Sequence, residues 1–403
     1  MPHQEPRIPA WIHFGTGLIL VSVGAVISSY AHHTSVGRHM EMVNLDAWLR
    51  AGKTVVDQHI MVVQITDADY ASKTFNRACP LPVAGVSKLI RAVALSGPKV
   101  IVVDLDTLHW TNDQRAAVLA EVDGARRKLG LAQAVQVAWA IGGAQGASGA
   151  EGDSGSLVLE KIDDPGYCFG VPAEIPDEYG VVRGYLPYVP RDRVPIPSLA
   201  IVASRLFEGK GCTGDVQPPV GDQLPPADLI DYSGGPERFL HLTAGTVLGT
   251  ADTYPWQNSN PIQSKIAVIG GSFQEARDRY VTPHGYLNGL DILAHAVVSA
   301  SLGGVPEPSR NKLLLSDVLV GMFLVTGSYF LHKYWFLAVS FVAIPFVALA
   351  ASFLIFSSTG YFISYVPVVA AVFLHHLIEH AEEHWRMRRE LHELRSKALP
   401  PPG

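Results

Sequence analysis

Hydrophobic and polar positions separate the chain into uniformly apolar stretches near its two ends and a mixed central region. Residues 11–30 contain no Lys, Arg, Asp or Glu, and about twenty apolar residues suffice for a helix to cross a bilayer. We interpret this stretch as an uncleaved first anchor, because a signal peptide would have a shorter apolar core and a more basic start. Three further stretches of spanning length cover residues 313–331, 335–356 and 361–377. The pattern therefore predicts four transmembrane helices.

The central region, residues 31–311, alternates between short apolar runs and amphipathic segments. Apolar runs predict strands at residues 59–65, 100–103, 134–140, 180–187, 229–232 and 266–269. Helical periodicity predicts helices at residues 82–96, 112–129, 198–207, 239–248 and 288–302. A glycine-rich stretch at residues 141–156 is interpreted as an exposed loop. Because strands that alternate with helices are typical of a sheet covered by helices, we expect an α/β domain with a mixed or mostly parallel sheet.

Residues 264–304 close this domain and lead into the second apolar stretch. The apolar run at residues 266–269 ends at Gly270 and Gly271, and glycines here indicate a positive φ angle or a close approach of the backbone to a neighbour. A charged loop, a Thr-Pro turn and an apolar helix follow. Their marker residues are Asp278, Thr282, Pro283, Gly289 and His295.

This succession resembles the closing motif of CHASE2 domains, which are extracytoplasmic sensory modules of bacterial membrane receptors. Residues 288–296 are similar to the family pattern "pGv.ihA", with Asn288 in place of the usual proline. Residues 229–232, followed by Ser-Gly-Gly, resemble the family's "lidy.g" strand. The resemblance runs from about residue 46 to residue 304. It implies one span before the sensory domain and three after it.

Positive residues indicate the orientation of the chain, because loops rich in Lys and Arg stay on the cytoplasmic side. If all four stretches cross, Arg7, Lys333 and the cluster at residues 386–389 fall on one side. We therefore predict a multi-pass protein of the bacterial inner membrane with both termini in the cytoplasm. The predicted parts are a cytoplasmic arm (residues 1–10), a first span (11–30), a periplasmic domain (31–311), three spans (312–378) and a cytoplasmic helical tail (379–403).

The composition of the chain argues against nucleic-acid binding. The chain of 403 residues is 48% hydrophobic and 17% charged, with a net charge of −6, so it lacks the basic footprint of a nucleic-acid-binding protein. Cys79, Cys168 and Cys212 can form at most one disulfide, and the sequence does not say whether it forms or between which two. No cofactor or metal site is predicted.

Five acidic residues are candidates for a ligand site in the periplasmic domain: Asp67, Asp69, Asp104, Asp106 and Asp278. The first four follow the strands predicted at residues 59–65 and 100–103, and open α/β sheets bind ligands at the carboxyl ends of their strands. Together they could hold a cation or a polar ligand. Alternatively, these carboxylates cap the helices that follow by accepting N–H hydrogen bonds. The sequence leaves both interpretations open.

Residues 376–380 read His-Leu-Ile-Glu-His and match a zinc-peptidase pattern. Such enzymes need a further protein ligand from a folded domain, and only a short tail follows here. We therefore interpret these residues as polar side chains at the point where a helix leaves the membrane.

Candidate contacts with the membrane or with a partner are Asp317, Trp385, Leu391 and Leu394. Asp317 is either a functional ionisable group inside a membrane helix or a residue near the outer end that reaches the lipid headgroups. In the tail, apolar and weakly polar residues recur at spacings of three and four, which is typical of a coiled-coil seam. We expect the tail to dock onto a partner or a second copy, and a frayed tail without a role is the alternative.

These observations favour a membrane-embedded sensory or scaffolding protein that signals to, or positions, a separate partner. CHASE2 receptors usually continue into a kinase or cyclase domain, and we expect no such output domain and no enzymatic activity here. One alternative is an accessory structural subunit of a larger envelope complex. Another is a periplasmic hydrolase that uses the carboxylates at the strand ends, although the sequence contains no G-x-S-x-G nucleophile motif. The stimulus, the partner and the oligomeric state are not evident from the sequence.

Overall fold

The computed structural model describes residues 35–51, 57–105, 107, 110–128, 135–141, 168–191, 194–212, 227–253, 260–302, 346, 349–350, 352–354, 381, 384–392 and 394–395. These residues belong to two compact units. One comprises residues 1–48 with 308–403, and the other comprises residues 49–307. The second unit contains the sheet and the candidate site.

A six-stranded sheet forms the centre of the second unit, in the order β10-β1-β11-β2-β3-β4. Its strands are β1 (Ile60–Ile65), β2 (Val100–Asp104), β3 (Gln136–Ala140), β4 (Cys168–Gly170), β10 (Leu240–Thr243) and β11 (Ile266–Gly271). All neighbouring pairs are parallel, and the register places Val62 beside Val268 and Val268 beside Val102. Their apolar sequences reflect burial on both faces, as parallel sheets require. The predicted α/β domain with a mostly parallel sheet is confirmed.

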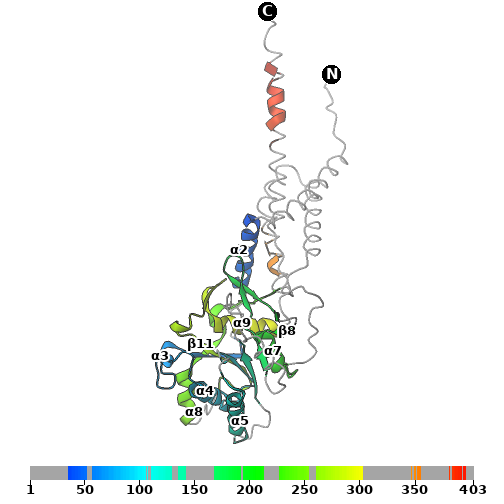
Figure 1. Ribbon diagram of the computed structural model, residues 1–403. Helices are drawn as coiled ribbons and strands as arrows, with labels where there is room; N and C mark the ends of the chain where they lie inside the picture. Colours follow the sequence, from blue (N-terminus) through cyan, green and yellow to red (C-terminus); the bar gives the residue numbers. More distant parts are fainter. Residues whose placement is uncertain are drawn as a thin grey trace, which may run out of the picture. The chain divides into compact units, whose positions relative to one another are not determined.

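Helices cover both faces of this sheet (Figure 1). Helices α4 (Val83–Leu95), α5 (Asn112–Lys128) and α8 (Ala244–Thr253) lie on one face, and α7 (Leu199–Glu208) and α9 (Gly289–Ser301) lie on the other. Side chains alternate along each strand, so Val63 and Ile101 join the core with Leu89 and Val122. The intervening strand residues face α7 and α9. Both layers of helices are therefore packed against fully buried strand residues.

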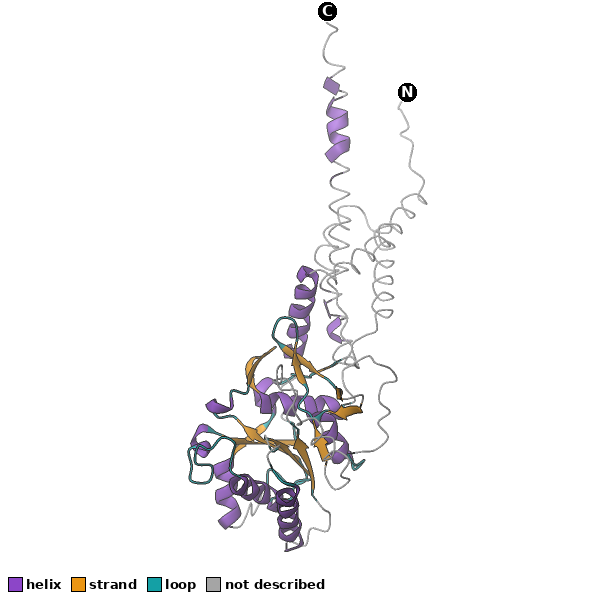
Figure 2. Ribbon diagram, viewed as in Figure 1, coloured by secondary structure: helices purple, strands orange, loops and turns teal. Residues whose placement is uncertain are grey.

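Smaller elements surround this three-layer core (Figure 2). They are α3 (Asp67–Tyr70), β5 (Glu174–Pro176), β6 (Val182–Tyr185), β7 (Tyr188–Arg191), β8 (Val194–Pro197), β9 (Asp228–Leu229), η1 (Gly235–Arg238), η2 (Gln274–Ala276), β12 (Arg279–Thr282) and β13 (Gly285–Asn288). Helix α2 (Ser35–Ala51) comes before them in the chain, and most of its residues belong to the first unit. Strands β5, β6 and β9 form a separate antiparallel sheet, and the pairs β7–β8 and β12–β13 form hairpins. The expected Thr-Pro turn is the tip of the β12–β13 hairpin, which the sequence pattern did not predict.

Two predicted elements differ from the structure. The helix predicted at residues 239–248 begins only at Ala244, because residues 240–243 form β10 and pair with β1 at the edge of the sheet. The strand predicted at residues 229–232 is reduced to β9, which ends at Leu229. Ile230 and Tyr232 are fully buried by tertiary packing. The apolar pattern at these positions therefore reflects burial and not a strand.

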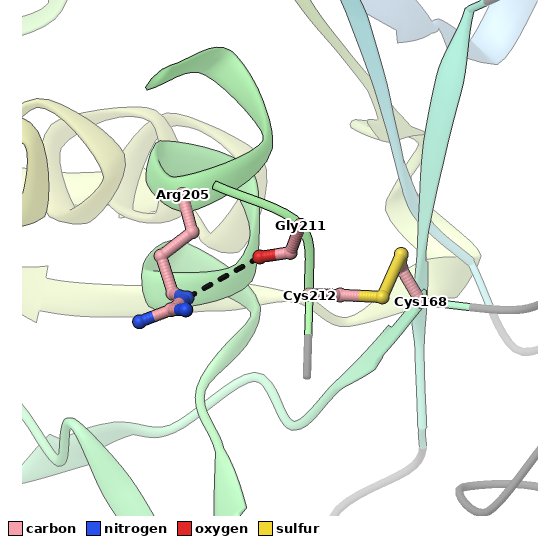
Figure 3. The surroundings of a disulfide bond; sticks show 4 residues. All are labelled: Cys168, Arg205, Gly211 and Cys212. Carbon is pink, nitrogen blue, oxygen red and sulfur yellow. Dashed lines mark hydrogen bonds between the residues drawn. A yellow bond between two sulfur atoms is a disulfide. The ribbon is translucent and has the colours of Figure 1, made fainter. Parts of the chain in front are cut away.

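A disulfide joins Cys168 on β4 to Cys212, beyond the end of α7 (Figure 3). Beside it, the Arg205 side chain donates from Nε to the carbonyl oxygen of Gly211, at 3.3 Å. The third cysteine, Cys79, is free and exposed. The bond therefore ties the outer strand of the sheet to the segment that follows α7.

The predicted membrane spans, the cytoplasmic arm, the glycine-rich loop beyond Ile141 and the residues Asp106, Asp317 and 376–380 lie outside the described residues, apart from short helical pieces at 346–354. Within the described part of the chain, no helix combines the length and the apolar character needed to cross a bilayer.

Candidate functional site

Three acidic side chains come together at the carboxyl edge of the parallel sheet. Asp104 is the last residue of β2 and pairs in register with Gly270 of β11. Asp278 lies between η2 and β12, and Glu174 begins β5 of the smaller sheet. Each carboxyl group is close enough to another for its charge to affect the neighbour's pKa. We call Asp104, Glu174 and Asp278 the acidic cluster.

Burial is the main influence on the protonation of the acidic cluster. It raises the pKa of Asp104 well above the usual value, and the charges of Asp278 and Glu174 add to this effect. Burial likewise raises the pKa of Glu174 to about 7, against a lowering by its own backbone and with a further contribution from Asp278. At neutral pH the cluster therefore does not carry three full negative charges. A proton, a cation or a hydrogen-bond donor would each relieve the repulsion.

Asp278 has two neighbours that hold it in place. Burial raises its pKa, and a hydrogen bond from the Tyr280 side chain opposes that rise. The same environment raises the pKa of Tyr280 to about 12, first through burial and then through the charge of Asp278. The Gly289 backbone N–H donates to the Asp278 carbonyl oxygen at 2.9 Å. A Cβ atom at Gly289 would overlap the Asp278 carboxylate, so only glycine allows this carboxylate to sit against the first residue of α9.

Gly270 and Gly271 also serve close packing. A Cβ atom at Gly270 would lie 2.6 Å from Cδ1 of Leu290 and 3.2 Å from the carbonyl oxygen of Asp104. At Gly271 it would lie 2.7 Å from the ring of Phe273. Neither glycine has a positive φ angle, and both remain within β11. The predicted close approach is present, whereas the alternative of a positive φ angle and the predicted end of the strand at residue 269 are wrong.

The acidic residues after β1 have a different role. Asp69 forms a reciprocal cap with Thr66, accepting from its backbone N–H at 3.0 Å and its hydroxyl at 2.8 Å. The other oxygen of Asp69 accepts the Gly245 N–H at 2.8 Å, at the start of α8. Asp67 accepts the Gln274 N–H at 2.8 Å. Capping and loop ordering, the alternative that the sequence left open, therefore account for Asp67 and Asp69.

His295 connects α9 to residues 229–235, the segment that resembles the "lidy.g" strand. Its ring is fully buried, with Nδ1 2.9 Å from the Asp231 carbonyl oxygen and Nε2 3.1 Å from that of Gly235. A neutral imidazole has one N–H and can donate to only one of these oxygens. Burial nevertheless lowers the pKa of His295 to about 4, and the positive charge of Arg238 contributes to this lowering. The imidazole is thus a neutral internal bridge that fixes α9 in place.

A second network of polar side chains also connects α9 to the segment that precedes and forms β10. The Arg238 guanidinium forms an ion pair with Asp231 at 2.9 Å, and the Asp231 backbone N–H donates to the Ser299 hydroxyl at 2.7 Å. At the other end of the helix, Nε2 of His241 lies 2.7 Å from the Asp291 carboxylate. Helix α9 is therefore held by polar contacts along most of its length.

Sequence reasoning missed Glu174, Tyr280 and the His241–Asp291 pair. Glu174 is more than one hundred residues from Asp278 in the sequence and reaches it only through the antiparallel pairing of β5 with β6. No local pattern marks such a position. Among the described residues, no group of three or more His, Cys, Asp or Glu side chains is arranged to hold a metal ion.

Comparison with known proteins gives one match. The family model of the CHASE2 domain matches residues 18–329, which is more than half of the chain and includes the whole sheet. The resemblance drawn from the closing unit is thereby confirmed. No curated protein matches the chain. No solved structure matches it either.

Proposed function

The chain belongs to the CHASE2 domain family, and we propose that it is a membrane protein whose periplasmic sensory domain signals to, or positions, a separate partner. CHASE2 domains are extracellular sensory domains, which supports the sensory part of the proposal. The observation that carries it further is the position of the acidic cluster. It touches the first residue of α9, and α9 is the last described element before the predicted second span.

The position of the cluster suggests how a stimulus would act. The positive end of a helix dipole stabilises a nearby carboxylate, whereas like charges in one buried site repel one another. A change in the charge of the cluster therefore changes the electrostatic free energy at the start of α9, where attraction to the helix dipole opposes repulsion between the carboxylates. Because His295 and Ser299 tie the later turns of α9 to residues 231–235, the helix would transmit the change along its axis to the segment that follows.

The disulfide supports the placement of this domain outside the cytoplasm. Disulfides persist in oxidising compartments such as the periplasm and are rare in the reducing cytosol. The bond between Cys168 and Cys212 fits the orientation inferred from the basic residues of the sequence. The four predicted spans and the cytoplasmic tail would then connect this domain to a partner, and we propose no catalytic role for the acidic cluster.

Hydrogen exchange of the full-length protein in mild detergent tests the coupling between the cluster and α9. After correction for intrinsic rates, we expect amide protection in the first turns of α9 to change when the pH falls from mildly alkaline to mildly acidic. Asp278→Asn should abolish the response. Asp67→Asn is the matched control, because Asp67 lies at the same edge of the sheet but contacts η2. An equal response in the Asp278→Asn protein would contradict the proposed coupling.

The partner is tested separately. Purification in mild detergent followed by mass spectrometry should recover a second protein in a fixed ratio to this chain. Recovery of the chain alone, under several detergents, would remove the separate partner from the proposal and leave the sensory domain in place.

A further inference from the structure

The described part of the tail is helical at residues 384–392, 394 and 395, and its apolar side chains are exposed. Met387 is 51% exposed, and Leu391 and Leu394 are each 64% exposed. At about 100° per residue, these three side chains and His384 lie within one narrow stripe of the helix. Their spacing of three and four residues is that of alternating a and d positions in a coiled coil. His384 and Leu391 occupy a, while Met387 and Leu394 occupy d.

Trp385 does not belong to this stripe. By the same angle it lies about 120° from Leu391 and about 180° from Leu394. The Arg389 guanidinium is 5.9 Å from the Trp385 ring centroid, one helical turn later. This contact shields part of the indole on the outer face of the helix. Trp385, which we had grouped with the two leucines as a contact residue, therefore points away from the seam.

Charged residues flank the stripe in an order that specifies a partner. With the seam in this register, Glu390 occupies a g position and Arg395 occupies the e position of the following heptad. Facing g and e residues of opposite charge form ion pairs between the helices of a parallel coiled coil. The sequence repeats the arrangement one heptad earlier with Glu383 and Arg388. In an antiparallel pair, g would face g and e would face e, which would place Glu against Glu and Arg against Arg.

We propose that this tail forms a parallel, in-register coiled coil with the tail of a second copy of the same chain. The occupant is a second copy because the helix is complementary to itself in this one orientation. The inference rests on the proposed membrane topology, which would present both tails on the same side of the bilayer. A seam of less than two heptads is marginal alone, but copies held by membrane spans meet at a high effective concentration.

Cysteine cross-linking of the full-length protein in native membranes tests the seam. In a Cys79→Ser background, Leu391→Cys or Leu394→Cys should give a cross-linked dimer on mild oxidation, because equivalent a or d residues meet in an in-register pair. Arg389→Cys is the matched control on the outer face and should cross-link several-fold less. Equal cross-linking at the control position, or none at either seam position, would overturn the proposal.

Charge reversal tests the orientation. Glu390→Arg should reduce cross-linking through Leu394→Cys several-fold, since it places Arg opposite Arg395 of the other copy. Adding Arg395→Glu should restore cross-linking. Residues 390 and 395 are five positions apart and do not face each other on one helix, so the restoration must come from contact between copies. Loss without restoration would rule out the parallel register.

The two proposals fail in different ways. If the seam positions do not cross-link while α9 still responds through Asp278, the tail inference is wrong and the sensory proposal stands. If the tails cross-link but Asp278→Asn has no effect on α9, the dimer is correct and the coupling is wrong.

Discussion

Glu174 and His295 give the sensory domain two opposite dependences on pH, because burial disfavours a negative charge in one and a positive charge in the other. The pKa of Glu174 rises from 4.5 to about 7. Folding therefore takes up a proton between these values, and stability falls as the pH rises through that window. The pKa of His295 falls from 6.5 to about 4. Its contribution to stability is present above pH 6.5 and is lost as the pH falls towards 4.

The variant Glu174→Gln should isolate the first of these dependences. At mildly alkaline pH the variant is expected to be more stable than the natural domain by about 1–2 kcal/mol, since it no longer buries a charge. At a pH below 4.5 the difference should vanish, because both side chains are then neutral. Denaturant unfolding of residues 49–307 across this range provides the measurement. Glu237→Gln, at an exposed position, is the control, and an unchanged pH profile in Glu174→Gln would show that Glu174 is solvated.

At the scale of elements, the junction between β11 and α9 depends on the absence of a side chain at Gly270. Gly270→Val would drive new methyl groups into Leu290, whose Cδ1 already lies 2.6 Å from the Cβ position. We expect a loss of about 1–3 kcal/mol in the free energy of unfolding, as in other overpacked sites. The control is Gly249→Ala on α8, where a Cβ atom has no neighbour within 4 Å. It should be neutral or slightly stabilising, and equal loss in both variants would contradict the packing argument.

The disulfide should stabilise the domain by restricting its unfolded state. Replacing both Cys168 and Cys212 with alanine frees a segment with a sequence separation of 44 residues, and we expect a loss of about 2–4 kcal/mol. Cys79→Ala is the matched control, because this cysteine is exposed and unbonded. Chemical denaturation of the oxidised proteins compares the three. Similar stability in the double variant and in the control would mean that the bond contributes little.

The elements that the sequence predicted well are those whose pattern has a local cause. Strands β1, β2, β3 and β11 appear as apolar runs because helices cover both faces of the sheet. The helix predicted over residues 239–248 was placed to start too early, because the short edge strand β10 has no such run and only its pairing with β1 makes it a strand.

The candidate site was predictable only in part, because only some of its residues are marked by a local sequence pattern. The rule for strand ends located Asp104, and the closing unit located Asp278. Glu174 joins them through the pairing of β5 with β6 in a separate sheet. No local sequence pattern around Glu174 predicts this pairing. Asp69 followed the same rule but caps its own helix, since a threonine three residues before a carboxylate satisfies the helix start locally.

At the scale of the whole molecule, a domain held by a disulfide and a tail rich in arginine must lie on opposite sides of a membrane if the proposed topology is correct. Under the proposed topology, arginines at 386, 388, 389 and 395 would retain the tail in the cytoplasm. The bond between Cys168 and Cys212 requires an oxidising compartment for the sheet. An odd number of spans must then separate the two parts, and the sequence offers three between residues 312 and 378.

This topology predicts the behaviour of a reporter enzyme that is active only in the periplasm. Inserted within residues 143–155, it should be active, because that stretch belongs to the disulfide-bonded domain. Fused after residue 403, it should be inactive, because the basic tail stays inside. A cytoplasm-only reporter at the same two positions is the control and should give the reverse result, which shows that both fusions are made and folded. Periplasmic activity at both positions would rule out three spans after the domain.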